Sequence, residues 1–388
     1  MCNKKILLLL TITLLVTGWQ INTLFPVSSL PIEDVKQDCV IIQPELPVGF
    51  LASGTILLGD FSERASIGQI MTLTSNSGQP IYLSDVPVAT TGATSPDNEL
   101  FAYSTIGEDN SSTLIVLDVN GKVEFTLPWD EKWGGFYWLN NKQLEFPYFW
   151  GGYWQGASPV SDIINVLTGQ REILAPSITE PWIPGGPLVP LLVVWKTAYD
   201  PTLSVVGYMR GEEPEQSFVL WDLKNNRELW KLDKWSTRTI HPAWTPDGKN
   251  LAVAVLNQKE DNWDRFELYL IGRDGQAEKW IDIKGYFKNV SLNISWSPNN
   301  RFLAIVPNEG QSFLILDTVT RELLDYCIPA DSGFASGIWS PDSSQILIAR
   351  QSDSSYPSIV FDVNNNRAAY LTNDPKFVPL GWLINYQH

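Results

Sequence analysis

Short apolar runs separated by polar turns recur through most of this chain. The clearest copy spans residues 294–324, where a Trp-Ser-Pro-Asn turn is followed by the apolar runs 302–306 and 313–316 and then by a further strand-like run. Apolar runs of this length bounded by turn residues are typical of strands buried on both faces. Pro298 presets the backbone for a type I turn, and such a turn joins two antiparallel strands. We therefore predict a four-stranded antiparallel sheet over this segment.

The same turn recurs along the sequence. The positions equivalent to Pro298 are 44, 61, 45, 52 and 43 residues apart, at Pro96, Asn140, Pro201, Pro246, Pro298 and Pro341. The second half of the unit recurs in phase with the first. Intervals of roughly 40 to 50 residues with this content are typical of the blades of a β-propeller.

The two ends of the chain set the number of blades. Residues 379–383 read as a first strand without its blade, whereas residues 54–59 and 70–83 read as outer strands without a first strand. Pairing the two ends would remove the exposed edges of a linear array. We predict an all-β, seven-bladed β-propeller of four-stranded antiparallel blades, closed by N- and C-terminal strands. Six or eight blades are the alternatives, because the 61-residue interval leaves the region between Trp138 and Trp221 least constrained.

The repeated turns ATSPDN, AWTPDG, SWSPNN and IWSPDS resemble those of TolB-type, WD-repeat-like β-propellers. The resemblance covers about residues 50–384. The chain is also similar to the non-catalytic propeller domain of dipeptidyl peptidase IV and prolyl oligopeptidase-like proteins. The resemblance implies a propeller fold, and it leaves open an interaction platform, an envelope assembly subunit or part of an enzyme.

The N-terminal residues differ from the repeats. Lys4 and Lys5 precede the apolar run 6–16, which is the layout of a secretory signal peptide or of an N-terminal anchor. We assign residues 1–18 to that signal or anchor, 19–49 to a proline-containing tether, and 50–388 to the propeller. No later apolar run is long enough to span a bilayer. The predicted location is extracytoplasmic: periplasmic, secreted or tethered to the cell surface.

Two cysteines, Cys39 and Cys327, lie beyond the N-terminal residues. In an oxidising compartment they could form a disulfide that pins the tether to the ring. Two separate thiols are the alternative. The sequence carries 43 acidic and 27 basic residues, for a net charge of −16. Such a charge disfavours nucleic acid and anionic membranes as partners.

Two series of residues recur at one register of the repeat. The tryptophans at the end of the first strand should pack between blades: Trp138, Trp244, Trp296, Trp339 and Trp382. The aspartates that close the third strand should accept hydrogen bonds from the turn that follows them: Asp118, Asp222, Asp317 and Asp362.

The long connections between repeats are expected on one face of the ring, where loops on a rigid scaffold usually bind ligands. They are rich in aromatic residues, whose rings suit sugars or protein partners. These rings could instead seal the loops against the blades. The candidate ligand-binding residues are Trp129, Trp133, Trp150, Tyr153, Trp154, Trp182 and Trp263, together with His241 at the channel.

The sequence contains no motif for nucleophilic hydrolysis, no standard metal-ligand spacing and no phosphate-binding loop. We therefore predict no catalytic residue, no metal and no cofactor. The leading hypothesis is an exported, monomeric, non-catalytic propeller that binds a protein or carbohydrate through its aromatic loop face. The alternatives are a carboxylate-based polysaccharide hydrolase or lyase and a TolB-like subunit of an envelope assembly.

Overall fold

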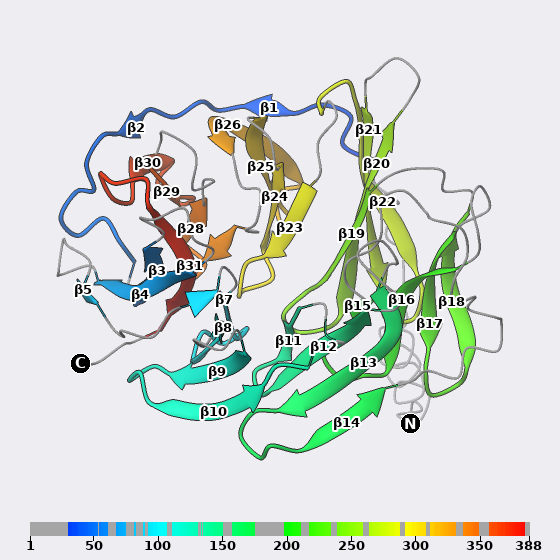
Figure 1. Ribbon diagram of the computed structural model, residues 1–388. Helices are drawn as coiled ribbons and strands as arrows, with labels where there is room; N and C mark the ends of the chain where they lie inside the picture. Colours follow the sequence, from blue (N-terminus) through cyan, green and yellow to red (C-terminus); the bar gives the residue numbers. More distant parts are fainter. Residues whose placement is uncertain are drawn as a thin grey trace, which may run out of the picture. The chain divides into compact units, whose positions relative to one another are not determined.

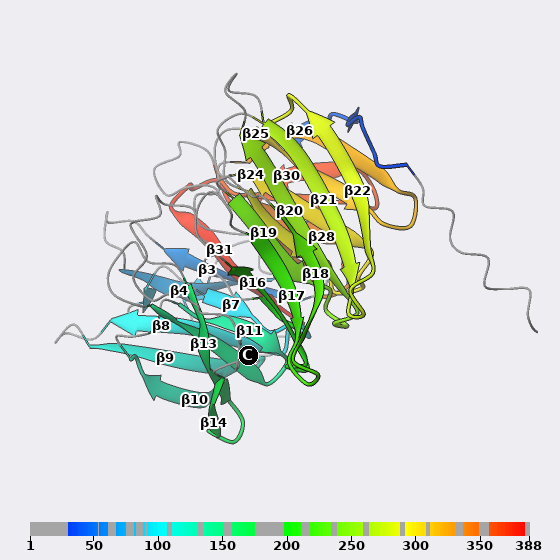
Figure 2. The ribbon, with the colours of Figure 1, turned by 90° about the vertical axis from the view of Figure 1, so that its right-hand side faces the viewer.

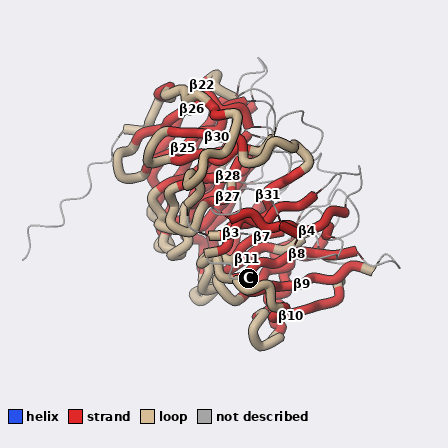
Figure 3. The backbone as a smooth tube through the Cα atoms, turned by 90° about the vertical axis from the view of Figure 1, so that its left-hand side faces the viewer, coloured by secondary structure: helices blue, strands red, loops and turns tan. Residues whose placement is uncertain are grey.

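The computed structural model describes residues 30–384 with gaps at 53, 61–66, 75–80, 83–87, 90–91, 107–110, 131–132, 134, 150–156, 175–197, 211–216, 234–238, 259–263, 288–291, 308–310, 331–336 and 349–356. The chain divides into two units, residues 1–31 and 32–388, and every sheet belongs to the second. The regular structure of the described residues is entirely β-strand, as Figure 3 shows. None of these residues forms a helix that could cross a bilayer.

The second unit consists of seven antiparallel sheets that follow one another around a centre (Figure 1). Each consecutive sheet is a blade whose first strand lies innermost. Blade 1 contains β7 (Gly92–Thr94), β8 (Leu100–Ile106), β9 (Ser112–Asp118) and β10 (Val123–Pro128). Blade 2 contains β11 (Tyr137–Asn140), β12 (Gln143–Phe149), β13 (Ala157–Asn165) and β14 (Arg171–Leu174). Blade 3 contains β15 (Ala198–Tyr199), β16 (Val205–Arg210), β17 (Ser217–Asp222) and β18 (Arg227–Leu232).

The remaining blades repeat this order. Blade 4 contains β19 (Thr239–Trp244), β20 (Asn250–Gln258), β21 (Asp264–Gly272) and β22 (Ala277–Lys284). Blade 5 contains β23 (Leu292–Trp296), β24 (Phe302–Pro307), β25 (Gln311–Asp317) and β26 (Glu322–Ala330). Blade 6 contains β27 (Ile338–Trp339), β28 (Gln345–Ile348), β29 (Ile359–Asp362) and β30 (Arg367–Tyr370).

Blade 7 joins the two ends of the propeller. Its strands are β31 (Phe377–Leu383), β3 (Thr55–Asp60), β4 (Ile67–Thr74) and β5 (Ile81–Tyr82), and β6 (Val88–Ala89) also pairs with β4. Strand β31 pairs with β3 from Thr55 opposite Leu383 to Asp60 opposite Phe377. The predicted seven-bladed propeller, closed by its two ends, is confirmed. The fold is that of the TolB-type, WD-repeat-like propellers that the repeated turns resemble.

In blades 1, 4, 5 and 6 the turn after the first strand is held by the hydroxyl that precedes its proline. In blade 5, the Ser297 hydroxyl donates to Asn299 Oδ1 at 2.7 Å and accepts from the Phe302 amide at 2.9 Å. Ser95 makes the equivalent bonds to Asp97 and to the Leu100 amide. These bonds replace main-chain pairing that a tight turn cannot supply, which explains the recurrence of Ser-Pro-Asp in the sequence.

Apolar side chains fill the space between neighbouring blades. One core cluster takes residues from blades 4 and 5, including Phe266, Leu268, Ile294 and Leu303. Figure 2 shows strands β19–β22 of blade 4 beside strands β24–β26 of blade 5. Because both faces of a blade are covered, its central strands are apolar without alternation, as Phe302–Pro307 illustrates.

The recurrent tryptophans bond one blade to the blade before it. In four of them the indole N–H donates to a backbone carbonyl of the preceding first strand: Trp138 to Ala93, Trp244 to Ala198, Trp296 to Ala243, and Trp339 to Ser295, at 2.9 to 3.1 Å. Trp382 is fully buried, but its indole nitrogen has no hydrogen-bond partner among the described residues. The tryptophan series therefore lies between blades, as the sequence predicts.

A belt, residues 32–43, crosses the outer strands of three consecutive blades (Figure 1). Ile32 bridges to Ile281 of β22, β1 (Lys36–Gln37) pairs with β26, and β2 (Ile42–Gln43) pairs with β30, all in parallel. Val40 and Ile42 pack inward while Ile41 between them is 90% exposed. This alternation is that of an added edge strand.

The belt is also joined covalently to the ring. Cys39 and Cys327 form a disulfide whose Cα atoms are 4.8 Å apart, 288 residues apart in the sequence. Of the two arrangements that the sequence leaves open, a bridge and separate thiols, the structure contains the bridge. The segment predicted as a tether therefore includes a stretch that lies along blades 4 to 6.

Candidate functional site

A cavity of about 610 Å³ lies at the centre of the ring. All seven first strands contribute to its wall, from Gly92–Thr94 in blade 1 to Leu380 in blade 7. The turns after the first strands contribute Pro96, Pro201, Pro246 and Pro298. The cavity therefore extends to the face of the ring that carries these tight turns. Its volume is within the range usual for small-molecule sites.

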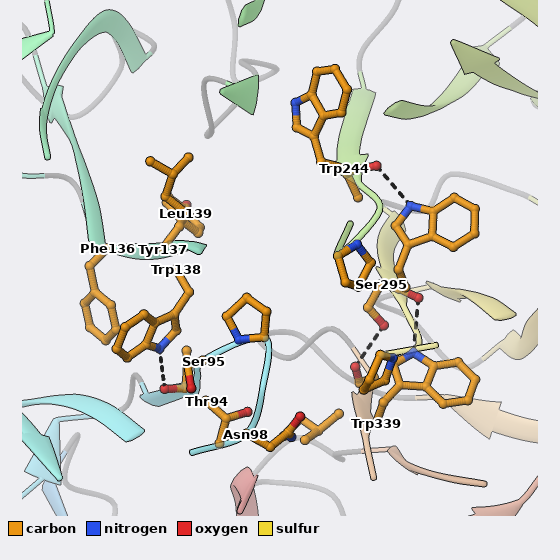
Figure 4. Close-up of a pocket in the computed structure, with 18 of the residues that line it drawn as sticks. Thr94, Ser95, Asn98, Phe136, Tyr137, Trp138, Leu139, Trp244, Ser295 and Trp339 are labelled. Atoms are coloured by element: carbon orange, nitrogen blue, oxygen red, sulfur yellow. Dashed lines mark hydrogen bonds between the residues drawn. The ribbon is translucent and has the colours of Figure 1, made fainter. Parts of the chain in front are cut away.

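Figure 4 shows Phe136 to Leu139 on one side of the cavity and Trp244, Ser295 and Trp339 on the other. The dashed lines include the interblade bonds of Trp339 and of Trp138. The first strands are the innermost strands of their sheets, so one edge of each faces the cavity rather than another strand. The N–H and C=O groups along such an edge can bond water or a ligand.

The repeat allows equivalent wall positions to be compared between blades. In each blade, the residue of the first strand that precedes the position of the recurrent tryptophan lies directly opposite a residue of the second strand. The seven pairs are Ala93–Ala102, Tyr137–Glu145, Ala198–Gly207, Ala243–Ala252, Ser295–Ala304, Ile338–Leu347 and Gly381–Leu57. In six of these pairs both residues are small or apolar, and Ser295 is the one polar residue among them. Only in blade 2 does the pair consist of a phenol, Tyr137, and a carboxylate, Glu145.

Blade 3, which packs against blade 2, also departs from the repeat. Tyr199 occupies the register at which five blades carry tryptophan, and it packs with Leu139 and Ile163 of blade 2. Ile163 lies directly opposite Glu145, which in turn lies opposite Tyr137, so these three side chains share one face of blade 2. Tyr199 therefore approaches Tyr137 and Glu145 from the neighbouring blade. All three residues line the cavity.

Glu145 is 1% exposed, and its Oε1 accepts a hydrogen bond from the Ser161 hydroxyl at 3.0 Å. Burial, together with the charge of Glu145, raises the pKa of Tyr137 to about 12 and also raises the pKa of Tyr199. Both phenols are therefore neutral at physiological pH and can donate hydrogen bonds. We call Tyr137, Glu145 and Tyr199 the acidic wall of the cavity.

The aromatic candidates from the sequence have different surroundings. Trp133 is 4% exposed and donates its indole N–H to Asp162 at 2.7 Å. Trp129 packs edge-on against Trp133 within the same core cluster. Trp150, Tyr153, Trp154, Trp182 and Trp263 lie outside the described residues.

His241 lies in β19 and is not among the residues that line the cavity, although Ala243 and Trp244 of the same strand are. Its Nε2 atom is buried and has no hydrogen-bond partner in the described part of the chain. Burial lowers its pKa to about 4, so its imidazole is neutral at physiological pH. Among the described residues, no group of three His, Cys, Asp or Glu side chains is placed to hold a metal ion.

The aspartates at the ends of the third strands act as the sequence predicts. Asp118 accepts from the amides of Asn120 and Lys122, and Asp222 accepts from the amide of Asn225. Asp317 and Asp362 make equivalent bonds to Val319 and Asn365. These carboxylates stabilise turns at the periphery of the blades.

No protein-family model matches the sequence, and no curated protein sequence is significantly similar to it. Solved propellers are similar in fold at low sequence identity. TolB from Acinetobacter baumannii is 14% identical with a TM-score of 0.43, over 72% of this chain and 64% of that one. The Myceliophteria thermophila Cps50 (Swd1) β-propeller domain is 11% identical with a TM-score of 0.45, over 85% and 97%. An oligogalacturonate lyase in complex with manganese is 16% identical with a TM-score of 0.48, over 82% and 85%.

Proposed function

We propose that this chain is an exported, non-catalytic binding propeller and that it holds its ligand in the central cavity. The observation that carries the proposal is the cavity itself. Its wall combines aromatic and apolar surface with a few polar side chains, among them Asn98, Glu145 and Ser295. Binding sites for small ligands usually have this composition.

The lining supports binding more than hydrolysis. Glu145 is the single carboxylate among the described residues that line the cavity. A glycoside hydrolase of the usual kind needs two carboxyl groups about 5 to 10 Å apart. The hydrolase or lyase and the TolB-like assembly subunit remain predictions from the sequence. No observation in the cavity favours either.

Export is supported by two independent features. Lys4, Lys5 and the apolar run that follows have the layout of a secretory signal or anchor. The disulfide between Cys39 and Cys327 is of a kind that persists in oxidising compartments. We propose an extracytoplasmic location, a monomer, and a ligand that is a carbohydrate, a small molecule or a segment of a protein.

The proposal is tested with a substitution that narrows the cavity at the end formed by the tight turns. Pro246 lines the cavity, whereas Pro341, the equivalent residue of blade 6, is not among the lining residues. We expect Pro246→Trp to abolish a ligand-dependent change in tryptophan fluorescence, measured with extracellular metabolite and glycan fractions. Pro341→Trp should leave that change intact. Equal responses of both variants and the parent protein would refute a cavity site.

A further inference from the structure

The belt is attached from outside to three sheets that already have four strands of their own. It adds a short parallel strand or a bridge to the outer edge of blades 4, 5 and 6 (Figure 1). Among the described residues, β22 and β26 are the two longest outer strands of the ring, with eight and nine residues. Long exposed edges of this kind readily pair with another chain. The belt therefore lies on the edges of the ring that are most open to pairing between molecules.

The noncovalent contacts of the belt are short and local. Strands β1 and β2 contain two residues each, and further backbone bonds join the belt to the ring singly, such as that from the Val40 amide to the Tyr326 carbonyl at 3.1 Å. The side chains of Val40 and Ile42 are half-buried against the core between blades 5 and 6. Contacts of this size hold a segment in place when a covalent link keeps it at a high effective concentration. The disulfide provides that link at blade 5.

The connection from the belt to blade 7 can redirect the belt. Phe50 is anchored on blade 6, because the Gln345 side chain donates to the Phe50 carbonyl and accepts from the Ala52 amide, each at 2.7 Å. The six residues 44–49 before this anchor are exposed apart from Leu46. An extended segment of that length spans up to about 20 Å. The belt can therefore leave its own ring while Phe50 stays in place.

We propose that the belt is an exchangeable edge strand, which the disulfide retains on its own ring and which, without that bond, pairs with the outer strands of a second copy of this chain. The second copy offers the surface that the belt already fits, so each contact made within one chain can also be made between two. Exchange of an identical element between copies is a low-cost route to a dimer. This inference goes beyond the proposed function and does not depend on the central cavity.

The disulfide lies where a reductant can reach it. Cys39 is exposed, and Cys327 is half-buried in the outer strand β26. A thiolate of a small dithiol attacks the Cys39 sulfur, and Cys327 leaves as a thiolate that takes up a proton. The second thiol of the reagent then displaces Cys39 as a thiol, and the reagent becomes a cyclic disulfide. Two electrons pass from the dithiol to the protein, and the covalent link between the belt and blade 5 is removed.

The test mixes two variants of the full chain, both of which also carry Cys2→Ser. Cys327→Ser retains Cys39 on its belt, whereas Cys39→Ser retains Cys327 on its outer strand. A belt that lies on the other copy brings the two remaining cysteines together. In a glutathione redox buffer, we expect the mixture to form the Cys39–Cys327 disulfide between copies about tenfold faster than either variant alone forms a disulfide-linked dimer. Nonreducing gel electrophoresis and peptide mapping measure both products.

A matched pair of substitutions distinguishes a docked belt from a chance encounter of two thiols. Ile42 packs against the ring, whereas its neighbour Ile41 is 90% exposed. In the copy that carries Cys39, Ile42→Asp should slow formation of the mixed disulfide about fivefold or more, because it removes an apolar contact of the belt. Ile41→Asp should change the rate by less than about twofold, because that side chain faces solvent. The folding of each variant is verified by its thermal transition.

Two results would overturn the inference. One is a mixture that forms the mixed disulfide no faster than the separate variants form their dimers. The other is an equal effect of Ile41→Asp and Ile42→Asp, which would mean that the thiols meet without docking of the belt. Rapid capture that only Ile42→Asp slows would establish the exchange. The fluorescence experiment with Pro246→Trp decides on the cavity separately.

Discussion

The disulfide between the belt and blade 5 allows a stability prediction with a calculable magnitude. The bond closes a segment of 288 residues. In the chain-entropy treatment, a loop of that length lowers the conformational entropy of the unfolded state by an amount equivalent to roughly 5 to 6 kcal/mol at 25 °C. Disulfides removed from natural proteins usually lower the free energy of unfolding by about 2 to 5 kcal/mol. We therefore expect the double variant Cys39→Ser, Cys327→Ser to lose about 2 to 5 kcal/mol.

The assay is equilibrium unfolding in guanidinium chloride, followed by tryptophan fluorescence. With a slope of about 6 kcal/mol/M, a loss of 3 kcal/mol lowers the midpoint by about 0.5 M. Cys2→Ser is the matched control and should leave the midpoint unchanged. Hydrogen exchange of the belt adds a local measurement, because β1 and β2 are each only two residues long. Without the disulfide their amides should exchange faster than those of β26.

An unchanged midpoint for the double variant would contradict this reasoning. It would mean that the noncovalent contacts of the belt, such as the packing of Val40 and Ile42, already hold it as firmly as the bond does. Faster exchange in the belt with an unchanged midpoint would place the effect of the disulfide in the folded state alone.

Two further predictions concern groups inside the ring. Trp296→Phe removes the 3.0 Å hydrogen bond from the indole N–H to the Ala243 carbonyl, whereas Trp382→Phe removes an indole N–H that has no partner among the described residues. In thermal unfolding, Trp296→Phe should therefore lower the free energy of unfolding by about 1 kcal/mol more than Trp382→Phe does. Equal losses would argue against a stabilising role for the interblade hydrogen bonds. His241 has a folded-state pKa of about 4, below its unfolded value of 6.5, so the unfolded chain binds the extra proton first as the pH falls. Above pH 6.5 the neutral imidazole lowers the free energy of unfolding by nothing, and between pH 6.5 and 4 denaturant titrations should show a loss of stability on the order of 3 kcal/mol. His241→Leu should lose less stability over that range. An identical pH profile for the variant would contradict the effect of burial on this imidazole.

The fold could be predicted because the repeat appears in the local sequence. The Ser-Pro-Asp turns and the recurrent tryptophans each mark one blade, and blade 3 is found despite having Tyr199 in place of tryptophan. The closure of the ring could be predicted because Trp382 continues the register of Trp339. The sequence also indicates both partners of the disulfide. The course of the belt could not be predicted, because pairing by strands of two residues leaves almost no periodic pattern.

The acidic wall was missed by the sequence analysis, although a signal for it was present. Glu145 lies in the apolar second strand of its repeat, at a position where the other blades have alanine, glycine or leucine. Aligning the repeats by register would have singled it out. Its proximity to Tyr199 depends on how blades 2 and 3 pack. The aromatic loop residues were more conspicuous in the sequence, but Trp129 and Trp133 pack within a core cluster.

The most direct measurement is the ligand-dependent change in tryptophan fluorescence of the full chain and of its Pro246→Trp and Pro341→Trp variants. The account predicts a saturable change that Pro246→Trp abolishes and Pro341→Trp leaves intact, because only Pro246 lines the central cavity. Equal responses of the parent protein and both variants would contradict the account.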